Sequence, residues 1–371
     1  MIYLDYNATA PMRPKVRQAM LDSFDHFGNP SSVHALGRKA RALIENARAT
    51  VAQSINTIES NVVFTSGGTE ANNLAILGLV QTGAKCLVSA IEHDSVIEFA
   101  GPQEQIAVTA GGLVDLQYLE RKLGEVRCNY SGPLLIAVML ANNETGVVQP
   151  IQEVVTLAKR YQTYVHCDAV QAFGKLPIDF QELGVDSMAL SAHKIGGPKG
   201  IGTLIVGKHL NLVSLLKGPG QERGMRAGTE SMTNIVGFQT AIQDAVSDDW
   251  QHVARLRDSL EDTLQRVCPT LKVYGRGCLR LPNTSCIMMP GVASQKQLMN
   301  FDLQGIAVSA GAACSSGKAK FSHVLKAMGV EASEASQALR VSLGWQTTQT
   351  DIEKFTQVWT KIYQRHCKEA V

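Results

Sequence analysis

The stretch that decides the fold is NVVFTSGGTEANNLAIL, residues 61–77. A β-branched and aromatic run at 61–65 leads into Gly67 and Gly68, and then into a helical apolar pattern. The glycines let the backbone bend, and we expect Thr69 to be the N-cap of the helix. Free backbone N–H groups at such a helix start form an anion site suited to phosphate. The stretch lacks the G-x-G-x-x-G pattern of dinucleotide-binding turns.

Strand-like and helix-like segments alternate from residue 61 to residue 207. The run 134–140 is apolar without alternation, as expected for a strand that is covered on both faces. This pattern predicts a three-layer α/β domain with a mainly parallel sheet. The predicted strands are 61–65, 86–90, 134–141, 163–168, 186–191 and 202–206, and the predicted helices include 70–81, 94–100 and 151–162.

The pattern changes after about residue 249, where a second, smaller unit is expected from the length of the chain. Its predicted elements are fewer and do not repeat the strand–helix alternation. We therefore expect a large α/β domain over 14–249 and a smaller α+β domain that includes 250–371. The elements predicted in the smaller domain are a helix at 250–267, strands near 270–274 and 284–289, and helices near 294–303 and at 350–367.

Three polar residues stand at or after the ends of predicted strands. Lys194 precedes a glycine-rich turn, and a desolvated lysine is an imine-forming nucleophile. Asp168 can pair with a protonated ring nitrogen, as pyridoxal phosphate requires. His93 follows the strand-like run at 86–90. Each residue taken alone also has a non-catalytic interpretation: a surface lysine, a helix-capping aspartate or a structural histidine. Ligands of open α/β sheets bind outside the carboxyl ends of the strands, so together they favour one site.

The composition argues against several classes of protein. The 371 residues are 45% hydrophobic with a net charge of +2, and no basic stripe indicates nucleic acid. No apolar run approaches the ~20 residues that span a bilayer, and an acid at Asp5 without a basic n-region argues against a signal peptide. The eight cysteines form no C-x-x-C pair, so neither zinc-ribbon nor redox-pair spacing is present. Most of them stand in apolar surroundings, as expected for core residues of a reduced, cytoplasmic protein.

Several short motifs of the sequence resemble those of a known family. Together with the glycine turn, His93, Asp168 and Lys194, these motifs resemble fold-type I pyridoxal-phosphate enzymes of the class V aminotransferase family, and most closely the NifS/IscS-type cysteine desulfurases. The resemblance covers nearly the whole chain and implies that residues 1–13 pack with the small domain. The motifs are LDYNATAP (4–11), FGNPSS (27–32), ANNETG (141–146), ERGMRAGT (222–229), SAGAACSS (309–316) and LRVSLG (339–344).

The resemblance implies how pyridoxal phosphate would be held. Lys194 is similar to the Schiff-base lysine and Asp168 to the partner of the ring nitrogen, while His93 is similar to the histidine that stacks on the ring and moves protons. Gln171 and Asn143 match residues near the phenolic oxygen of the ring. In the family one phosphate contact comes from the second subunit, here Thr229, which implies a homodimer. The other residues of the implied phosphate cradle are Gly68, Thr69, Ser191 and His193.

The resemblance also implies the substrate and the reaction. Arg340 matches the guanidinium that holds the α-carboxylate, with Asn143 and Asn7 beside the substrate. Family segments that line the site also contain Asn29 and His34. Cys314 resembles the nucleophile that takes sulfur from L-cysteine, leaving L-alanine and a persulfide. The persulfide is then delivered to a sulfur acceptor or an iron–sulfur scaffold protein.

The segment around Cys314 is small and glycine-flanked, with little apolar area to anchor it, which predicts mobility. No metal site is expected, except that Cys314 could transiently ligate an iron–sulfur cluster. Other readings are a selenocysteine lyase, another class V aminotransferase-type enzyme, or a silent paralogue that only binds partners. An aminotransferase has no need for Cys314, and the intact set of site residues argues against the silent paralogue.

Overall fold

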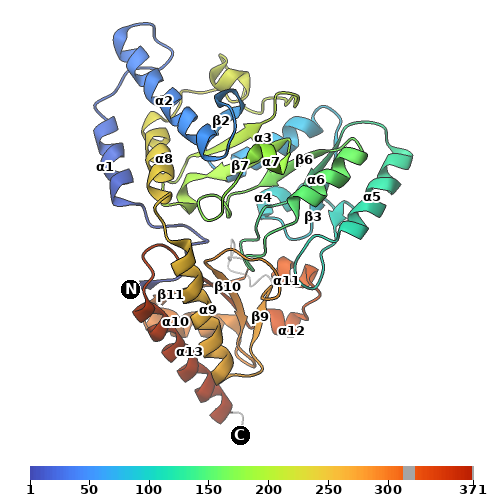
Figure 1. The fold of residues 1–371 in the computed structure, drawn as a ribbon, viewed down its shortest axis with the longest axis vertical. Helices are drawn as coiled ribbons and strands as arrows, with labels where there is room; N and C mark the ends of the chain where they lie inside the picture. Colours follow the sequence, from blue (N-terminus) through green and yellow to red (C-terminus); the bar gives the residue numbers. More distant parts are fainter. Residues whose placement is uncertain (312–321, 370–371) are drawn as a thin grey trace.

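A computed structural model describes residues 1–311 and 322–369. Its larger part is built on a mixed, mostly parallel sheet (Figure 1). Only β8 runs antiparallel to its neighbours among the paired strands of this sheet. The predicted fold class is thereby confirmed. The strand order is β2 (Val62–Thr65), β8 (Gly202–Val206), β7 (Ser187–Ser191), β6 (Tyr164–Asp168), β5 (Leu134–Ala137), β3 (Lys85–Ser89) and β4 (Gln105–Ile106).

Helices cover both faces of this sheet because its strands are apolar on both faces. In β5, Leu134 and Ile136 belong to one hydrophobic core, and Leu135 and Ala137 belong to the other. The second core is covered by α3 (Gly68–Val80) and α4 (Asp94–Ile97). The first core is covered by α1 (Pro14–Ser23), α2 (Ala35–Ser54), α5 (Leu116–Asn129), α6 (Ile151–Arg160) and α8 (Met232–Ala245).

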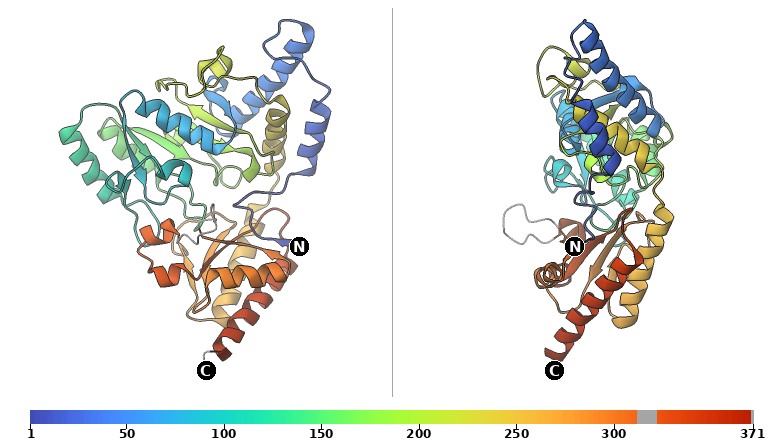
Figure 2. Two further views of the ribbon diagram at one scale, coloured as in Figure 1. Left: turned by 180° about the vertical axis from the view of Figure 1, so that it is seen from behind. Right: turned by 90° about the vertical axis from the view of Figure 1, so that its left-hand side faces the viewer.

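A smaller part lies at one end of the molecule, with the start of the chain beside it (Figure 2). Its core joins Leu4 to Leu260, Phe301 and Trp359. One sheet pairs β1 (Ile2–Tyr3) with β11 (Ile306–Ala307). The other has the order β12 (Ser309–Ala310), β13 (Ala338–Ser342), β10 (Thr284–Met288) and β9 (Lys272–Tyr274). Its helices are α9 (Trp250–Val267), α10 (Ser294–Leu303), α11 (His323–Ala327), α12 (Ala332–Ala335) and α13 (Gln349–Glu369).

Leu4 lies in this core, whereas Ala10 and Arg13 donate hydrogen bonds to backbone oxygens of the large part. The predicted domain bounds, 14–249 against 1–13 with 250–371, stay predictions. Within the described ranges, no helix is both long and apolar enough to cross a membrane.

One detail of the predicted glycine turn was wrong. The helix α3 begins at Gly68 and its N-cap is Gly67, so Thr69 lies inside the first turn. Gly67 has φ of 154° and ψ of −178°, a conformation that essentially only glycine adopts. The unusual backbone at Gly67 moves the start of the helix closer to the end of β2 than a threonine cap would.

Some other predicted boundaries also shift. The helix predicted at 94–100 ends at Ile97, because Phe99 and Ala100 donate to the third residue back, which tightens the chain. The strand predicted at 134–141 ends at Ala137. The helices α1, α2, α5 and α8 were not predicted.

Candidate active site

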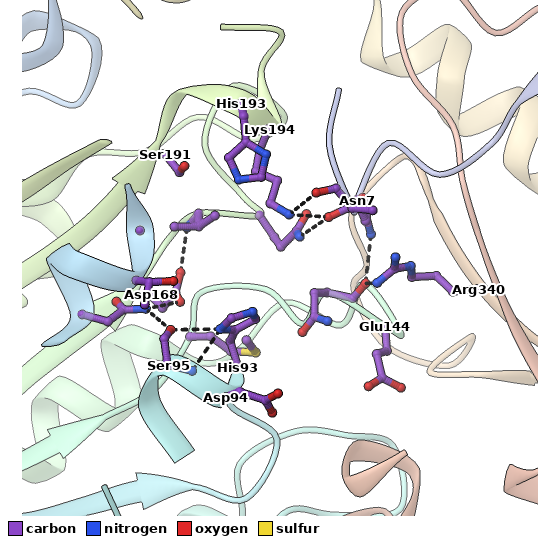
Figure 3. Close-up of a pocket in the computed structure, with 18 of the residues that line it drawn as sticks. Asn7, His93, Asp94, Ser95, Glu144, Asp168, Ser191, His193, Lys194 and Arg340 are labelled. Atoms are coloured by element: carbon purple, nitrogen blue, oxygen red, sulfur yellow. Dashed lines mark hydrogen bonds between the residues drawn. The ribbon is translucent and has the colours of Figure 1, made fainter. Parts of the chain in front are cut away.

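The carboxyl ends of β6 and β7 open onto a cavity of about 400 Å³, a size typical of small-molecule sites. Figure 3 shows Lys194 and His93 facing each other across it, with Asp168 at one end and Arg340 at the other. The small part of the molecule supplies the wall at the Arg340 end. The predicted site residues that line this cavity are Asn7, Gly68, Thr69, His93, Asn143, Asp168, Gln171, Ser191, His193, Lys194 and Arg340.

Lys194 ends the short 3₁₀ turn η2 (Ala192–Lys194), which directly follows β7. Its Nζ donates hydrogen bonds to the backbone oxygens of Asn7, at 2.6 Å, and of Ala8, at 2.8 Å. Burial and the Arg340 guanidinium lower the pKa of Lys194 to about 8, although nearby carboxylates oppose the shift. A larger fraction of this amine is therefore neutral near physiological pH, and the neutral amine is the nucleophilic form.

Asp168 is the last residue of β6 and is buried. Its Oδ2 accepts a hydrogen bond from Asn72 Nδ2 at 2.7 Å, and its Oδ1 accepts one from the Val170 backbone at 2.9 Å. His166 Nε2 donates to Asn72 Oδ1 at 2.9 Å, and burial lowers the pKa of His166 to about 3, so its ring is neutral. The carboxylate is thus oriented by neutral groups, and its charge is left for a cationic ligand atom.

His93 is the N-cap of α4. The backbone N–H of Ser95 donates to His93 Nδ1 at 3.1 Å, and Ser95 Oγ lies 2.9 Å from the same nitrogen. Because Nδ1 accepts a hydrogen bond, the neutral ring carries its proton on Nε2. This cap therefore fixes both the orientation and the tautomer of His93.

The start of α3 forms the anion-binding end of the cavity. A Cβ on Gly68 would lie 2.7 Å from Val170 Cγ2, so this position needs glycine. The first-turn N–H groups of a helix lack acceptors within the helix and carry its positive dipole end. Ser191 and His193 stand beside this turn. Burial, followed by the positive charge of Lys194, lowers the pKa of His193 to about 4, so the ring is a neutral hydrogen-bonding group.

Arg340 lies on β13 and is 7% exposed. Its Nη2 donates to Asp5 Oδ1 at 2.9 Å, and its Nη1 donates to the Asn143 backbone oxygen at 3.4 Å. Its buried Nε has no hydrogen-bond partner among the described residues. Because Arg340 lines the cavity, its guanidinium suits a carboxylate ligand there.

Asn7 joins the two parts of the molecule at the cavity. Its backbone oxygen accepts hydrogen bonds from Lys194 and from Gln171 Nε2, the latter at 2.9 Å. Its side-chain Nδ2 donates to Thr284 Oγ1 at 2.8 Å, and its Oδ1 accepts from Asn283 at 3.0 Å. The amide of Asn7 is therefore engaged in contacts that hold the small part against the large one.

Three predicted residues that the structure describes do not line this cavity. Thr229 is exposed and does not line the cavity. Asn29 Oδ1 accepts from the Ser31 backbone, and His34 is the N-cap of α2, so both have local contacts. Cys314 lies outside the described residues.

The sequence did not point to Glu144 or His323 as lining residues. Glu144 is buried and accepts a hydrogen bond from Ser322 Oγ at 2.6 Å, and burial raises the pKa of its carboxyl. His323 Nε2 donates to the Glu92 backbone oxygen at 2.8 Å. Glu144 lies inside the motif ANNETG, which could have indicated that it lines the site. Nothing in the sequence near His323 indicated a site.

This set of groups fits pyridoxal phosphate. An amine with a lowered pKa, a carboxylate at one end and a helix start for a phosphate surround one cavity. The absence of a Cβ at Gly68 lets the Val170 side chain pack closely against the start of α3.

The Aminotransferase class-V family matches residues 2–355. The chain belongs to this family. Cysteine desulfurase IscS of Dictyoglomus turgidum is 37% identical and covers 98% of this chain and 95% of that protein. The putative cysteine desulfurase IscS 1 of Bacillus subtilis is 38% identical and covers 95% of this chain and 96% of that protein.

Solved structures agree with this class-V assignment. A NifS-like protein from Rickettsia africae has a TM-score of 0.90 at 37% identity, and covers 98% of this chain and 99% of that chain. SspA in complex with cysteine has a TM-score of 0.81 at 30% identity, and covers 94% of this chain and 100% of that chain. These comparisons confirm the NifS/IscS-type resemblance and the fold class. Class-V enzymes generally depend on pyridoxal phosphate.

Proposed function

We propose that this chain is a cysteine desulfurase that uses pyridoxal phosphate to convert L-cysteine into L-alanine, with the sulfur captured as a persulfide on Cys314. The observation that carries this function is the meeting of Lys194, Asp168 and Arg340 at one cavity in a chain related to cysteine desulfurases over nearly its whole length. The three groups are an amine, an acid and a carboxylate receptor, the set that an amino-acid-processing enzyme of this kind needs.

The residues of the cavity divide the work of holding the cofactor. Lys194 holds it covalently, Asp168 keeps its ring nitrogen protonated, and the start of α3 with Ser191 and His193 receives its phosphate. When bound, pyridoxal phosphate supplies an electron sink for the bonds to the substrate Cα. The hydrogen bonds behind Asp168 hold that carboxylate in position at the cavity.

Arg340 and His93 act on the substrate itself. Arg340, which lines the cavity, binds the α-carboxylate of L-cysteine through its guanidinium. Lys194 takes or returns the Cα proton, and His93, with its Nε2 proton set by Ser95, serves as the second proton-carrying group.

The sulfur transfer requires a nucleophile, which we assign to Cys314. A bond forms between the Cys314 sulfur and the substrate sulfur while the substrate Cβ–S bond breaks. The Cβ then gains a proton and becomes the methyl group of alanine. The net change is L-cysteine plus a thiol to L-alanine plus a persulfide, so atoms and electrons balance without an oxidant.

The test compares the wild type with Cys314→Ser and Lys194→Ala, measuring cofactor absorbance and alanine released from L-cysteine in the presence of a thiol. We expect Cys314→Ser to keep the cofactor and lose nearly all alanine production, and Lys194→Ala to lose both. Near wild-type alanine release by Cys314→Ser would show that the nucleophile is misassigned and would favour a selenocysteine lyase. A colourless wild type without turnover would overturn the enzyme proposal as a whole.

We infer that the enzyme is a homodimer in which Thr229 reaches the phosphate of the partner's site. Thr229 is exposed rather than turned into its own cavity. Apolar side chains are also exposed around α1 and α2, with Phe24 at 67%, Phe27 at 80% and Val33 at 87%. Sedimentation velocity should give a dimer, whereas an active monomer at assay concentration would contradict the inference.

The persulfide is delivered to a sulfur-acceptor protein in the cytoplasm, such as an iron–sulfur scaffold. This step is supported by the relationship to IscS-type proteins and not by any contact in the structure. Transfer of radioactive sulfur from preloaded enzyme to an added scaffold protein would test it, with Cys314→Ser as the control that should transfer nothing.

A further inference from the structure

Lys175 is a buried cation that the proposed chemistry does not use. It is 5% exposed, and no carboxylate forms an ion pair with it among the residues that the structure describes. Other buried cations are paired: Arg48 binds Glu222 at 2.7 Å, and Arg280 binds Glu261 at 2.8 Å. An unpaired buried charge is destabilising, so Lys175 invites a functional explanation.

The contacts of Lys175 lead to the wall of the cavity. Its Nζ donates to the Gln171 backbone oxygen at 2.8 Å and to Gln171 Oε1 at 3.1 Å. An ammonium group has donors only, so it holds the oxygen of the Gln171 amide toward itself. The NH₂ group is consequently turned the other way, where one N–H reaches the Asn7 backbone oxygen at 2.9 Å. Gln171 lines the cavity, and its remaining N–H is the one left for a ligand.

The charges that act on Lys175 are both positive. Burial is the main cause of the lowered pKa of Lys175, which falls from 10.5 to about 7, and Lys194 and Arg340 lower it further. The folded protein therefore binds fewer protons than the unfolded chain between about pH 7 and pH 10.5. The contribution of Lys175 to the stability of the cofactor-free protein should therefore rise with pH through this window. It should be least favourable below pH 7.

We propose that Lys175 is a positioning residue: it orients the Gln171 amide as a donor toward the cavity and places positive charge behind it for an anionic ligand oxygen. The proposal rests on the proposed function, in which the phenolic oxygen of pyridoxal phosphate is that anionic group. Binding such an oxygen supplies the negative charge that Lys175 lacks in the protein alone.

The experiment uses Lys175→Met, which removes charge and donor, and Lys175→Gln, which keeps a neutral donor and is the safer variant for folding. Lys159→Met, at an exposed lysine on α6, is the control for losing one positive charge. Each full-length protein is prepared with and without pyridoxal phosphate. Thermal unfolding of the cofactor-free form is measured from pH 6 to pH 10. The cofactor's Kd and the pH midpoint of its visible absorption band are measured on the loaded form.

We expect Lys175→Met to unfold at least ~2 °C higher than wild type at pH 6–7, because an unpaired buried charge is gone. Its Kd for pyridoxal phosphate should rise about ten-fold, as for a lost hydrogen bond to a charged group. Removing positive charge near Lys194 should raise the band midpoint by about one pH unit. Lys175→Gln should show the band shift with a smaller change in Kd.

A wild-type band midpoint and Kd in both Lys175 variants would overturn the proposal and leave Lys175 as a packing residue. If Lys175→Met fails to fold, the band midpoint and the Kd of Lys175→Gln test the proposal instead. A shift of equal size in Lys159→Met would also overturn it, because any lost charge would then have the same effect. Failure of the wild type to bind pyridoxal phosphate would instead reject the proposed function.

Discussion

At the scale of single residues, Lys194 shows how a surface-type side chain becomes reactive. Its amine is held between two backbone oxygens at 2.6 and 2.8 Å and lies near the positive charge of Arg340. Neither contact is local in sequence, since Asn7 and Ala8 lie at the start of the chain. Because the pKa of Lys194 falls to about 8, the residue is protonated below pH 8 and increasingly neutral above it.

We expect covalent capture of pyridoxal phosphate by the cofactor-free protein to quicken as pH rises, with a midpoint near pH 8. Borohydride trapping at a series of pH values, followed by peptide mapping, measures both the rate and the position of the label. Lys199→Met is the matched control at a neighbouring lysine and should still be labelled at Lys194. A label on another lysine, or a rate independent of pH, would contradict the assignment.

Arg340→Lys should raise the KM for L-cysteine by roughly ten-fold or more, because an ammonium group cannot make the paired hydrogen bonds of a guanidinium. The expected change in kcat is smaller, and the cofactor absorbance should stay as in the wild type. Steady-state kinetics over a range of L-cysteine concentrations give the split between KM and kcat. An unchanged KM would show that the substrate carboxylate binds elsewhere.

At the scale of elements, the small part depends on a buried ion pair as well as on its apolar core. Glu261 on α9 is 1% exposed and accepts hydrogen bonds from Arg280 at 2.8 and 2.9 Å and from Ser285 Oγ at 2.8 Å. This pair joins α9 to the strand β10 and to the loop before it. Its removal leaves a guanidinium buried without a partner.

Glu261→Ala should lower the free energy of unfolding by about 3–5 kcal/mol. The neighbouring Asp262 is the matched control, because it is exposed and pairs with the half-exposed Arg276. Asp262→Ala should change the free energy by less than about 1 kcal/mol. Urea unfolding of the three proteins measures both differences, and equal effects at the two positions would argue against the importance of burial.

At the scale of the whole molecule, the exposed position of Thr229 predicts active sites shared between two subunits. Lys194→Ala should be inactive, and Thr229→Asp should be strongly impaired at limiting cofactor because its charge repels a phosphate. Mixed dimers then contain one intact site, so co-expression should restore about a quarter of the wild-type activity if subunits pair at random. Alanine production by the purified mixture measures this, and no gain over the separate variants would refute shared sites.

Much of the fold can be predicted from the sequence, because buried positions are apolar and their spacing reflects the secondary structure. The run from Leu134 to Ala137 lies between two cores, so every residue is apolar and the strand is visible in the sequence. The helices α1 and α2 leave a weaker record, since they are largely exposed on one side and precede the strand–helix alternation. Helix ends such as that at Gly67 depend on backbone geometry that residue type only suggests.

The sequence by itself determined the class of fold, the family and the ends of strands where Lys194, Asp168 and His93 stand. It could do so because parallel strands present their carboxyl ends along one edge, wherever the chain goes afterwards. Only the tertiary structure decided what surrounds these residues. The contact of Lys194 with Asn7 spans 187 positions, and that of Arg340 with Asp5 spans 335. Such partners are chosen by how the two parts of the molecule pack together, and no local pattern records that packing. Lys175 is likewise buried without an ion-paired carboxylate among the described residues, which its place in the sequence does not reveal.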